Sequence, residues 1–245
     1  MINKIKIVTN KISIKKPTVI FAFPGVGLVG SIVGKYLVEQ LSSKQIGHVE
    51  SPHLPPVSFI QKGRVYDSIR IYESKKEGML IVTSEFPVPQ NVIFDLGEAF
   101  SVWSKEIKAK NLVCIEGLKL SNEESVGEVF AITNQETAKL PVGFKPVESG
   151  YILGVSAALM LKSKKFNLPA ICYMVQSHAD YPDGLAAAGL IKNFNKLFNL
   201  TINVKPLEEE ANLFESKLKE FVKQTKSLTE QHLPKEDNHD NLMYG

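Results

Sequence analysis

The sequence contains little cysteine and no concentrated charge. Cys114 and Cys172 are its only two cysteines, and both stand in apolar runs, which predicts buried, reduced thiols in a cytoplasmic protein rather than a disulfide or a metal site. No run of five or more like charges occurs, and 29 basic against 26 acidic residues leave a net charge of +3. Because nucleic-acid binding draws its affinity from concentrated positive charge, the composition argues against nucleic acid as the main partner.

A membrane-spanning segment is also missing. Residues 17–34 carry no charge, but a spanning helix needs about 20 mostly apolar residues in unbroken succession. Pro24, Gly25, Gly27 and Gly30 stand in the middle of this stretch, where they would interrupt such a helix. The segment therefore predicts a strand, a turn and a helix, and we expect no membrane partner.

What the chain does contain is an alternation of short β-rich runs and amphipathic stretches. The expected strands cover residues 18–23, 46–50, 80–83, 111–115 and 169–175, and the expected helices cover 28–42, 91–108, 152–164 and 185–200. Strands that alternate with helices predict an α/β fold with a mostly parallel sheet and helices on both faces. Residues 1–226 are expected to form one domain, within which residues 120–150 fit either strands or a loop.

A further helix is expected to begin at Pro206, with acidic residues in its first turn. Its apolar residues recur at steps of three and four: Leu207, Ala211, Phe214, Leu218 and Phe221. Such a narrow stripe favours a helix packed on its own domain, with a helix that also packs against a neighbouring subunit as the alternative.

Residues 227–245 are too polar to bury enough surface to offset their chain entropy, so we expect a flexible tail. Apolar character returns at its tip with Leu242, Met243 and Tyr244, followed by Gly245 and its free carboxylate. A receptor can recognise a terminal carboxylate by a positive charge, while the tyrosine supplies contact area and one directed hydrogen bond. The tail therefore predicts a partner-binding device made of Leu242, Met243, Tyr244 and Gly245.

Met243-Tyr244-Gly245 resembles the HbYX motif, in which a hydrophobic residue, a tyrosine and any residue precede the carboxylate. The body of the chain resembles the proteasome assembly chaperone family in its archaeal form over roughly residues 17–222. The matching segments are residues 23–30, 54–58 with Gly63-Arg64, 83–90, 115–118, 150–154 and 178–189.

The resemblance implies a fold similar to nucleoside phosphorylases and a non-enzymatic chaperone or adaptor without a cofactor. It implies homo-oligomers, with a tetramer or a pentamer expected, and the α subunits of the proteasome as partners. Met243 would fill an apolar slot between two α subunits, Tyr244 would order the pocket, and the Gly245 carboxylate would pair with a receptor lysine. A role in assembly and a role in opening the finished particle both remain open.

The alternative is a nucleotide-dependent enzyme. Gly25, Gly27 and Gly30 form a G-x-G-x-x-G pattern after a strand and at the start of a helix, and Glu50 follows 20 residues later. In a dinucleotide-binding fold such a loop holds pyrophosphate at the helix N-terminus, and the acidic residue binds the ribose.

A second set of polar residues follows the expected strands: Glu85, Glu116, His178, Asp180 and Asp183. Because the carboxyl ends of parallel strands share one edge, these side chains are candidates for acid–base chemistry or metal binding. The simpler interpretation, which we favour, is that they are loop residues that cap helices, with Asp183 at the N-cap of the helix beginning near Leu185.

Overall fold

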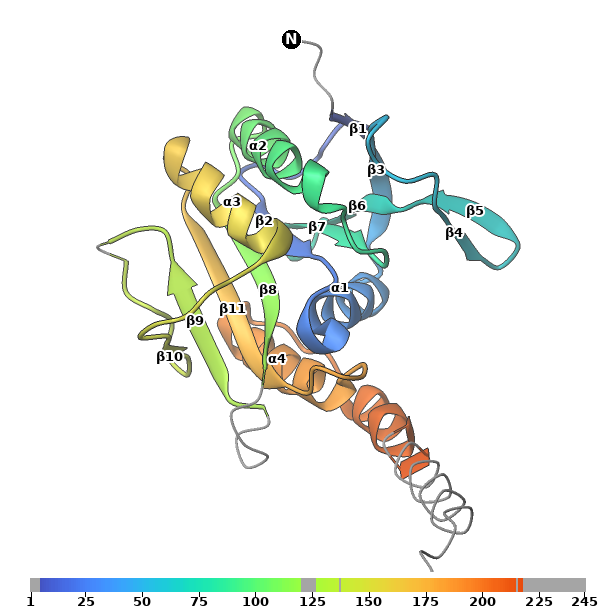
Figure 1. Ribbon diagram of the computed structural model, residues 1–245, viewed down its shortest axis with the longest axis vertical. Coiled ribbons are helices and arrows are strands. Elements are labelled where there is room, and N and C mark those ends of the chain that lie inside the picture. Colours follow the sequence, from blue (N-terminus) through green and yellow to red (C-terminus); the bar gives the residue numbers. More distant parts are fainter. Residues whose placement is uncertain (1–4, 120–126, 137, 215, 218–245) are drawn as a thin grey trace, which may run out of the picture.

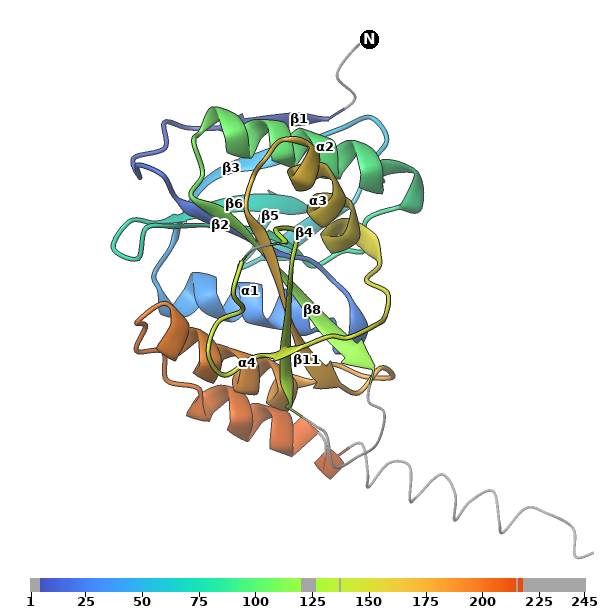
Figure 2. The ribbon, with the colours of Figure 1, turned by 90° about the vertical axis from the view of Figure 1, so that its left-hand side faces the viewer.

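The computed structural model describes residues 5–119, 127–136, 138–214 and 216–217. Within these residues, nine strands form one sheet that carries helices on both faces (Figures 1 and 2). The strands of this sheet are β1 (Lys6–Thr9), β2 (Thr18–Ala22), β3 (Lys44–Glu50), β6 (Ile69–Ser74), β7 (Met79–Ser84), β8 (Asn111–Lys119), β9 (Val129–Thr133), β10 (Lys145–Pro146) and β11 (Ala170–Ser177). The helices are the short 3-10 turn η1 (Val26–Leu28), α1 (Val29–Gln40), α2 (Gln90–Glu106), α3 (Gly154–Lys165) and α4 (Gly184–Leu197). A separate hairpin consists of β4 (Ser58–Gln61) and β5 (Arg64–Asp67).

The sheet is mixed, which corrects the expectation of a mostly parallel one. The strand order is β1-β3-β6-β7-β2-β8-β11-β9-β10, and only the centre, from β7 to β11, is continuously parallel. On one side the pairs β1–β3, β3–β6 and β6–β7 are antiparallel, and on the other side β9 is antiparallel to β11. The reason is connection length, since a parallel crossover needs a dozen or more residues, and residues 75–78 between β6 and β7 allow only a hairpin.

Two apolar cores lie on opposite faces of this sheet. One face is covered by α1 and α4, with Leu37 and Phe194 fully buried, and the other is covered by α2 and α3, with Phe100 and Leu159 fully buried. The rings of Phe100 and Phe21 lie 5.0 Å apart, which fixes α2 on strand β2. The expected placement of helices on both faces is confirmed, because the strands between them have apolar residues on both sides.

The two cysteines are buried and free, and they face each other from neighbouring strands. Cys172 of β11 is the register partner of Cys114 of β8. Burial raises the pKa of both thiols, and the nearby Glu116 carboxylate raises it further. Both side chains therefore behave as small core residues, as predicted.

The helix expected from Pro206 is present, since residues 205–214 and 216–217 are helical. Leu207 is buried in the α1–α4 core, and a Cβ on Gly184 would lie 2.7 Å from the Cβ of Ala211, so the helix packs closely on the start of α4. Phe214, however, is 44% exposed, and Leu213 beside it is 58% exposed. Packing on its own domain therefore leaves much of the apolar surface of this helix uncovered.

The hairpin β4–β5 was not predicted, nor were β1, β6 and the short β10. The hairpin projects from the body beside β6 (Figure 1). None of the helices in the described residues is both long and apolar enough to cross a membrane.

Candidate functional site

The predicted partner-binding residues, Leu242, Met243, Tyr244 and Gly245, lie outside the described residues, as does the whole expected tail 227–245. The last described part of the chain is the helix before the tail, up to residue 217.

The glycine loop is filled by the protein's own side chains. It connects β2 to α1 and lies across the ends of β8 and β11. A Cβ on Gly25 would lie 2.3 Å from a carboxylate oxygen of Glu116, and one on Gly27 would lie 1.9 Å from the hydroxyl oxygen of Ser177. Gly27 also has φ +59°, and its carbonyl accepts a hydrogen bond of 2.9 Å from the Asp183 N–H. These glycines therefore serve close packing of the loop on the strand ends, and a carboxylate stands where a pyrophosphate would have to approach.

The dinucleotide fingerprint also fails on topology. In such a fold the acidic residue ends the strand next to the one that precedes the glycine loop. Here β2 pairs with β7 and β8, whereas β3, which ends at Glu50, pairs antiparallel with β1 and β6. Glu50 instead bonds to Lys6 across the edge strand, so the loop and this acid do not form one site.

The polar residues after the strands separate into independent pairs. Glu85 forms an ion pair with Arg70, and His178 Nδ1 lies 3.0 Å from Asp183 Oδ2, while Asp180 is exposed. Asp183 accepts a hydrogen bond of 2.8 Å from Ala186 N–H, which confirms it as the N-cap of α4. Within the part of the chain that the structure describes, no three His, Cys, Asp or Glu side chains are grouped as metal ligands.

Glu116 has an unusual environment within this group. Burial raises the pKa of its carboxyl to about 7, and a hydrogen bond with Ser156 only partly opposes this effect. Within the described residues this carboxylate bonds to a hydroxyl of α3 and lies against Gly25 of the loop. The Glu116 carboxylate thus connects the glycine loop to helix α3.

Arg70 anchors the unpredicted hairpin to the body. It is buried in β6, and its guanidinium lies 4.5 Å from the ring centre of Phe59 on β4 and 5.8 Å from that of Tyr66 on β5. Glu85, at the end of β7, supplies the opposite charge. One buried cation therefore joins both strands of the hairpin to the central sheet through cation–π contacts and an ion pair.

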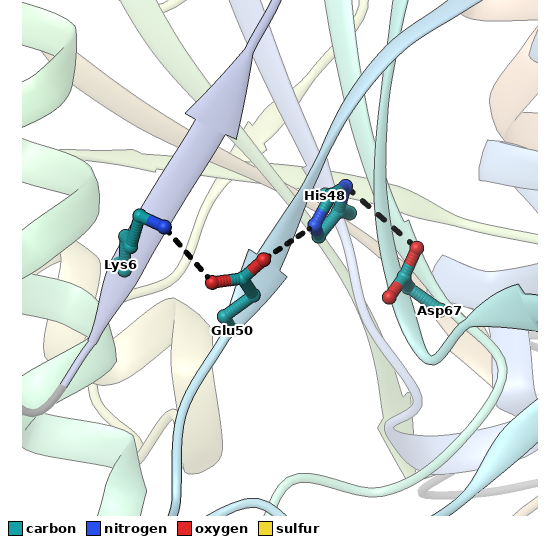
Figure 3. Close-up of polar contacts among 4 residues, drawn as sticks. All are labelled: Lys6, His48, Glu50 and Asp67. Atoms are coloured by element: carbon teal, nitrogen blue, oxygen red, sulfur yellow. Dashed lines mark hydrogen bonds and ion pairs between the residues drawn. The ribbon is translucent and has the colours of Figure 1, made fainter.

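A chain of polar contacts joins the base of the same hairpin to the sheet edge (Figure 3). Lys6 Nζ lies 3.1 Å from Glu50 Oε2, and the His48 ring lies between Glu50 Oε1 at 3.0 Å and Asp67 Oδ2 at 3.7 Å. Hydrogen bonds from His48 and Lys6 lower the pKa of the Glu50 carboxyl. The contacts run from β1 through β3 to β5.

Next to these contacts lies an open pocket of about 820 Å³ between the hairpin and the loop that precedes it. Polar and apolar groups line it in similar measure, and many of the polar groups come from the base of the hairpin and the sheet edge. Lining residues include Leu54, Pro55, Pro56, Val57, Val65 and Asp67. Val65 belongs both to the pocket lining and to the outer face of the hairpin. Its register partner on that face is Ile60, and the two side chains are 71% and 70% exposed.

Comparison with known proteins places this architecture in a family. The profile of the PAC2 family matches residues 19–222, which is most of the chain. The chain belongs to the PAC2 family. An uncharacterized protein of Methanocaldococcus jannaschii is 32% identical over 236 residues, which are 95% of this chain and 94% of the relative.

Two solved structures from Pyrococcus furiosus share the PAC2 fold. PbaA, described as an archaeal homolog of proteasome-assembly chaperone, has a TM-score of 0.81 and 25% identity, covering 93% of this chain and 95% of that one. PbaB, described as an archaeal proteasome activator, has a TM-score of 0.76 and 21% identity, covering 90% and 99%. At that identity the likeness to PbaB concerns the fold alone.

The sequence did carry a signal for the hairpin. Residues 58–61 and 64–67 are two four-residue runs separated by Lys62-Gly63, and Gly63 has φ +72°. A two-residue connection with glycine is typical of a β-hairpin. Its attachment through Arg70 had no such signal, because an arginine in a strand is ordinarily exposed.

Proposed function

We propose that this PAC2 protein is a non-enzymatic proteasome assembly chaperone or adaptor of the cytoplasm, which docks its C-terminal tail into pockets between proteasome α subunits. The likeness to PbaA over nearly the whole of both chains carries this proposal. The terminal tripeptide Met243-Tyr244-Gly245, with its likeness to the HbYX motif, supplies the docking chemistry.

Each terminal group has a distinct part in the proposed contact. Leu242 and Met243 bury apolar surface in a slot between subunits, and the ring of Tyr244 adds contact area and a hydroxyl for one hydrogen bond. The carboxylate of Gly245 pairs with a lysine of the α subunit. About 17 residues of polar tail form a tether with a root-mean-square span of roughly 20–25 Å, long enough to reach a neighbouring particle.

Several tails on one homo-oligomer, a tetramer or a pentamer, would act together. Each docking event is weak by itself, but after the first tail binds, the others act at a high effective concentration. The proposal therefore needs both the tail and self-association.

Capture of purified archaeal proteasome α subunits tests the tail. The intact chain is expected to retain them, whereas Tyr244→Ala and a chain shortened by residues 243–245 are expected to lose at least about tenfold in retained subunit. Tyr244→Phe, which keeps the ring and removes only the hydroxyl, is expected to fall between these.

Asn238→Ala, which changes the same tail outside the motif, is the matched control and is expected to bind like the intact chain. Equal capture by the intact, shortened and Tyr244→Ala chains would reject the docking mechanism.

A further inference from the structure

Exposed lysines lie together at the end of the sheet where the parallel strands begin. Strands β7, β2, β8 and β11 are neighbours in this order, and each begins directly after a segment that contains lysines. Their starts lie side by side, because Thr18 is the register partner of both Met79 and Asn111. Leu112 and Ala170 are partners in the same way. The segments are residues 15–17, 75–78, 105–110 and 164–169, and their exposed lysines, which we call the basic rim, are Lys15, Lys16, Lys75, Lys76, Lys105, Lys108, Lys110, Lys164 and Lys165.

Backbone hydrogen bonds hold neighbouring segments of the basic rim against one another. The Thr18 N–H donates to the Gly78 carbonyl at 3.1 Å, and the Lys110 N–H donates to the Pro17 carbonyl at 2.8 Å. The segments are far apart in the sequence, where no run of five or more like charges occurs. The fold therefore concentrates in space a positive charge that is dispersed along the chain.

The basic rim contains little negative charge. Its segments carry nine lysines and only two acidic residues, Glu77 and Glu106, whereas the whole chain has a surplus of three positive charges. Lys164 and Lys165 each reach a glutamate of another segment at 3.8 Å. Within the residues that the structure describes, the other seven lysines take part in none of the ion pairs.

Helix ends account for only some of these lysines. A cation in the last turn of a helix is stabilised by the helix macrodipole, and Lys105, Lys164 and Lys165 have such positions. Lys105 and Lys165 also lie over one ring, at 5.9 and 5.8 Å from the centre of Phe166. The lysines before β2 and β7 belong to no helix, so the macrodipole gives no reason for them.

The chemistry of the basic rim fits the backbone of a duplex nucleic acid. Protein interfaces are depleted of lysine and centre on apolar or aromatic anchors, and stable membrane binding takes an apolar anchor beside the basic residues. None of the large exposed apolar side chains in the described residues lies in the four segments. Phe166, the only aromatic residue of these segments, is partly buried, so they offer no exposed ring on which the bases of a single strand could stack.

The length of the basic rim also fits a row of phosphates. Four neighbouring strands span about 14 Å, at roughly 4.8 Å from one strand to the next. One strand of a DNA duplex carries a charge about every 3.4 Å along the helix axis, so about four phosphates cover this length. Nine lysines on flexible stems are enough for each of these phosphates to contact an ammonium group.

We propose that the basic rim binds the phosphate backbone of double-stranded nucleic acid without regard to base sequence. Lysine ammonium groups donate to phosphate oxygens, and the release of condensed counterions supplies the affinity. This binding goes beyond the proposed docking to the proteasome and does not depend on it. The helix before the tail reaches the opposite end of the sheet, where the Phe214 ring lies 6.4 Å from that of Tyr181, four residues after β11. Nucleic acid on the basic rim therefore leaves that end of the helix uncovered.

Fluorescence anisotropy of a labelled 20-base-pair DNA duplex tests the proposal with the full-length chain. At 50 mM salt we expect a dissociation constant in the micromolar range. Four phosphate contacts give a slope of roughly −3.6 in log K against log salt, so the affinity is expected to fall about 100-fold at 200 mM. A duplex of another sequence is expected to bind equally well, and a single strand more weakly.

Charge reversal distinguishes the basic rim from the net charge of the chain. The rim variant replaces one exposed lysine of each segment: Lys15→Glu, Lys76→Glu, Lys110→Glu and Lys164→Glu. The matched control makes the same change in net charge at exposed lysines elsewhere: Lys35→Glu, Lys62→Glu, Lys119→Glu and Lys217→Glu. The control is expected to bind the duplex at least about tenfold more tightly than the rim variant, because only the latter places like charges opposite the phosphates.

A single neutral change keeps the test decisive if the rim variant is unstable, which circular dichroism melting would reveal. Lys110→Gln is expected to make the salt slope less steep by up to about 0.9, the contribution of one phosphate contact. Tyr244→Ala is expected to bind the duplex like the unaltered chain, which separates this proposal from tail docking.

Three results would overturn the proposed binding. The first is the absence of duplex binding at 50 mM salt. The second is an equal loss of affinity in the rim variant and its control, together with an unchanged salt slope in Lys110→Gln. The third is tighter binding to phosphatidylserine vesicles than to the duplex at the same salt concentration, which would assign the basic rim to a membrane surface.

Discussion

Glu116 shows how one residue can explain a motif that resembles something else. Its carboxylate lies over Gly25 and takes the place at the glycine loop that a phosphate would need. A side chain at this position would push the carboxylate out of its place. The pattern G-x-G-x-x-G is therefore satisfied in this chain by internal packing.

The raised pKa of Glu116 predicts a pH-dependent stability. With a pKa of about 7 in the folded state and an ordinary value near 4.5, the unfolded chain ionises first as the pH rises. The free energy of unfolding should thus be undiminished below pH 4.5, fall between about pH 4.5 and 7, and stay at its lower level above. At about 1.4 kcal/mol per pKa unit the loss is at most about 3.5 kcal/mol.

Glu116→Gln removes this contribution to the pH dependence of stability, because glutamine does not ionise. Calorimetric melting from pH 5 to pH 8 is expected to show that the melting temperature of the variant rises relative to that of the unaltered chain as the pH rises. Glu148→Gln, at an exposed position, serves as the control and should leave the profile unchanged. Parallel profiles for the unaltered chain and Glu116→Gln would contradict the prediction.

At the scale of elements, the β4–β5 hairpin depends on tertiary contacts for its order. A two-stranded hairpin is at best marginally stable in water by itself. Phe59 and Tyr66 are register partners on the side facing Arg70, and their rings enclose its guanidinium. The remaining large apolar residues of the hairpin, Ile60 and Val65, face outward.

Arg70→Met keeps the aliphatic stem but removes the charge that Phe59, Tyr66 and Glu85 share. We expect amide hydrogen exchange in residues 58–67 to rise about tenfold or more, while exchange in the central strands changes little. Exchange measured by mass spectrometry after peptic digestion resolves the two regions.

Lys44→Met removes an exposed cation from the neighbouring strand β3 and is the matched control. Glu85→Gln is expected to have a smaller effect than Arg70→Met, because it leaves the stacking intact. An equal rise across the whole sheet in Arg70→Met would mean that Arg70 stabilises the domain rather than the hairpin.

Several elements were predictable because their signals are local. The buried strands β2, β7, β8 and β11 are continuous apolar runs, and the helices on either face repeat apolar residues at helical spacing. The N-cap at Asp183 was identified because aspartate before a helical pattern has a specific hydrogen-bonding role. The antiparallel strands on the two sides of the sheet were not predicted. Neither β6 nor β9 has a decisive apolar pattern, and the segments that connect the strands decide which strands pair.

At the scale of the whole molecule, the proposed function has two separate requirements, tail docking and self-association. Tyr244→Ala is expected to keep the oligomer and lose capture of α subunits. The unaltered chain, diluted until sedimentation velocity shows the monomer, is expected to keep the tail motif and lose only the gain in affinity from multiple tails. For linked weak sites this gain is about 100- to 10,000-fold.

Biolayer interferometry on immobilised α rings compares Tyr244→Ala and the diluted, monomeric chain with the oligomer. A monomer that dissociates as slowly as the oligomer would contradict the multivalent mechanism. Asn238→Ala is again the matched control, with unaltered dissociation expected.

The sequence by itself determined the α/β architecture, the two helix layers, the buried thiols and the apolar tip of the tail, because each depends on periodicity or composition within a short stretch. Only the tertiary structure decided that Glu50 lies far from the glycine loop, that Glu116 fills this loop, and that Arg70 holds a hairpin. These relations depend on which elements lie side by side, and strand order, which no local pattern encodes, decides this.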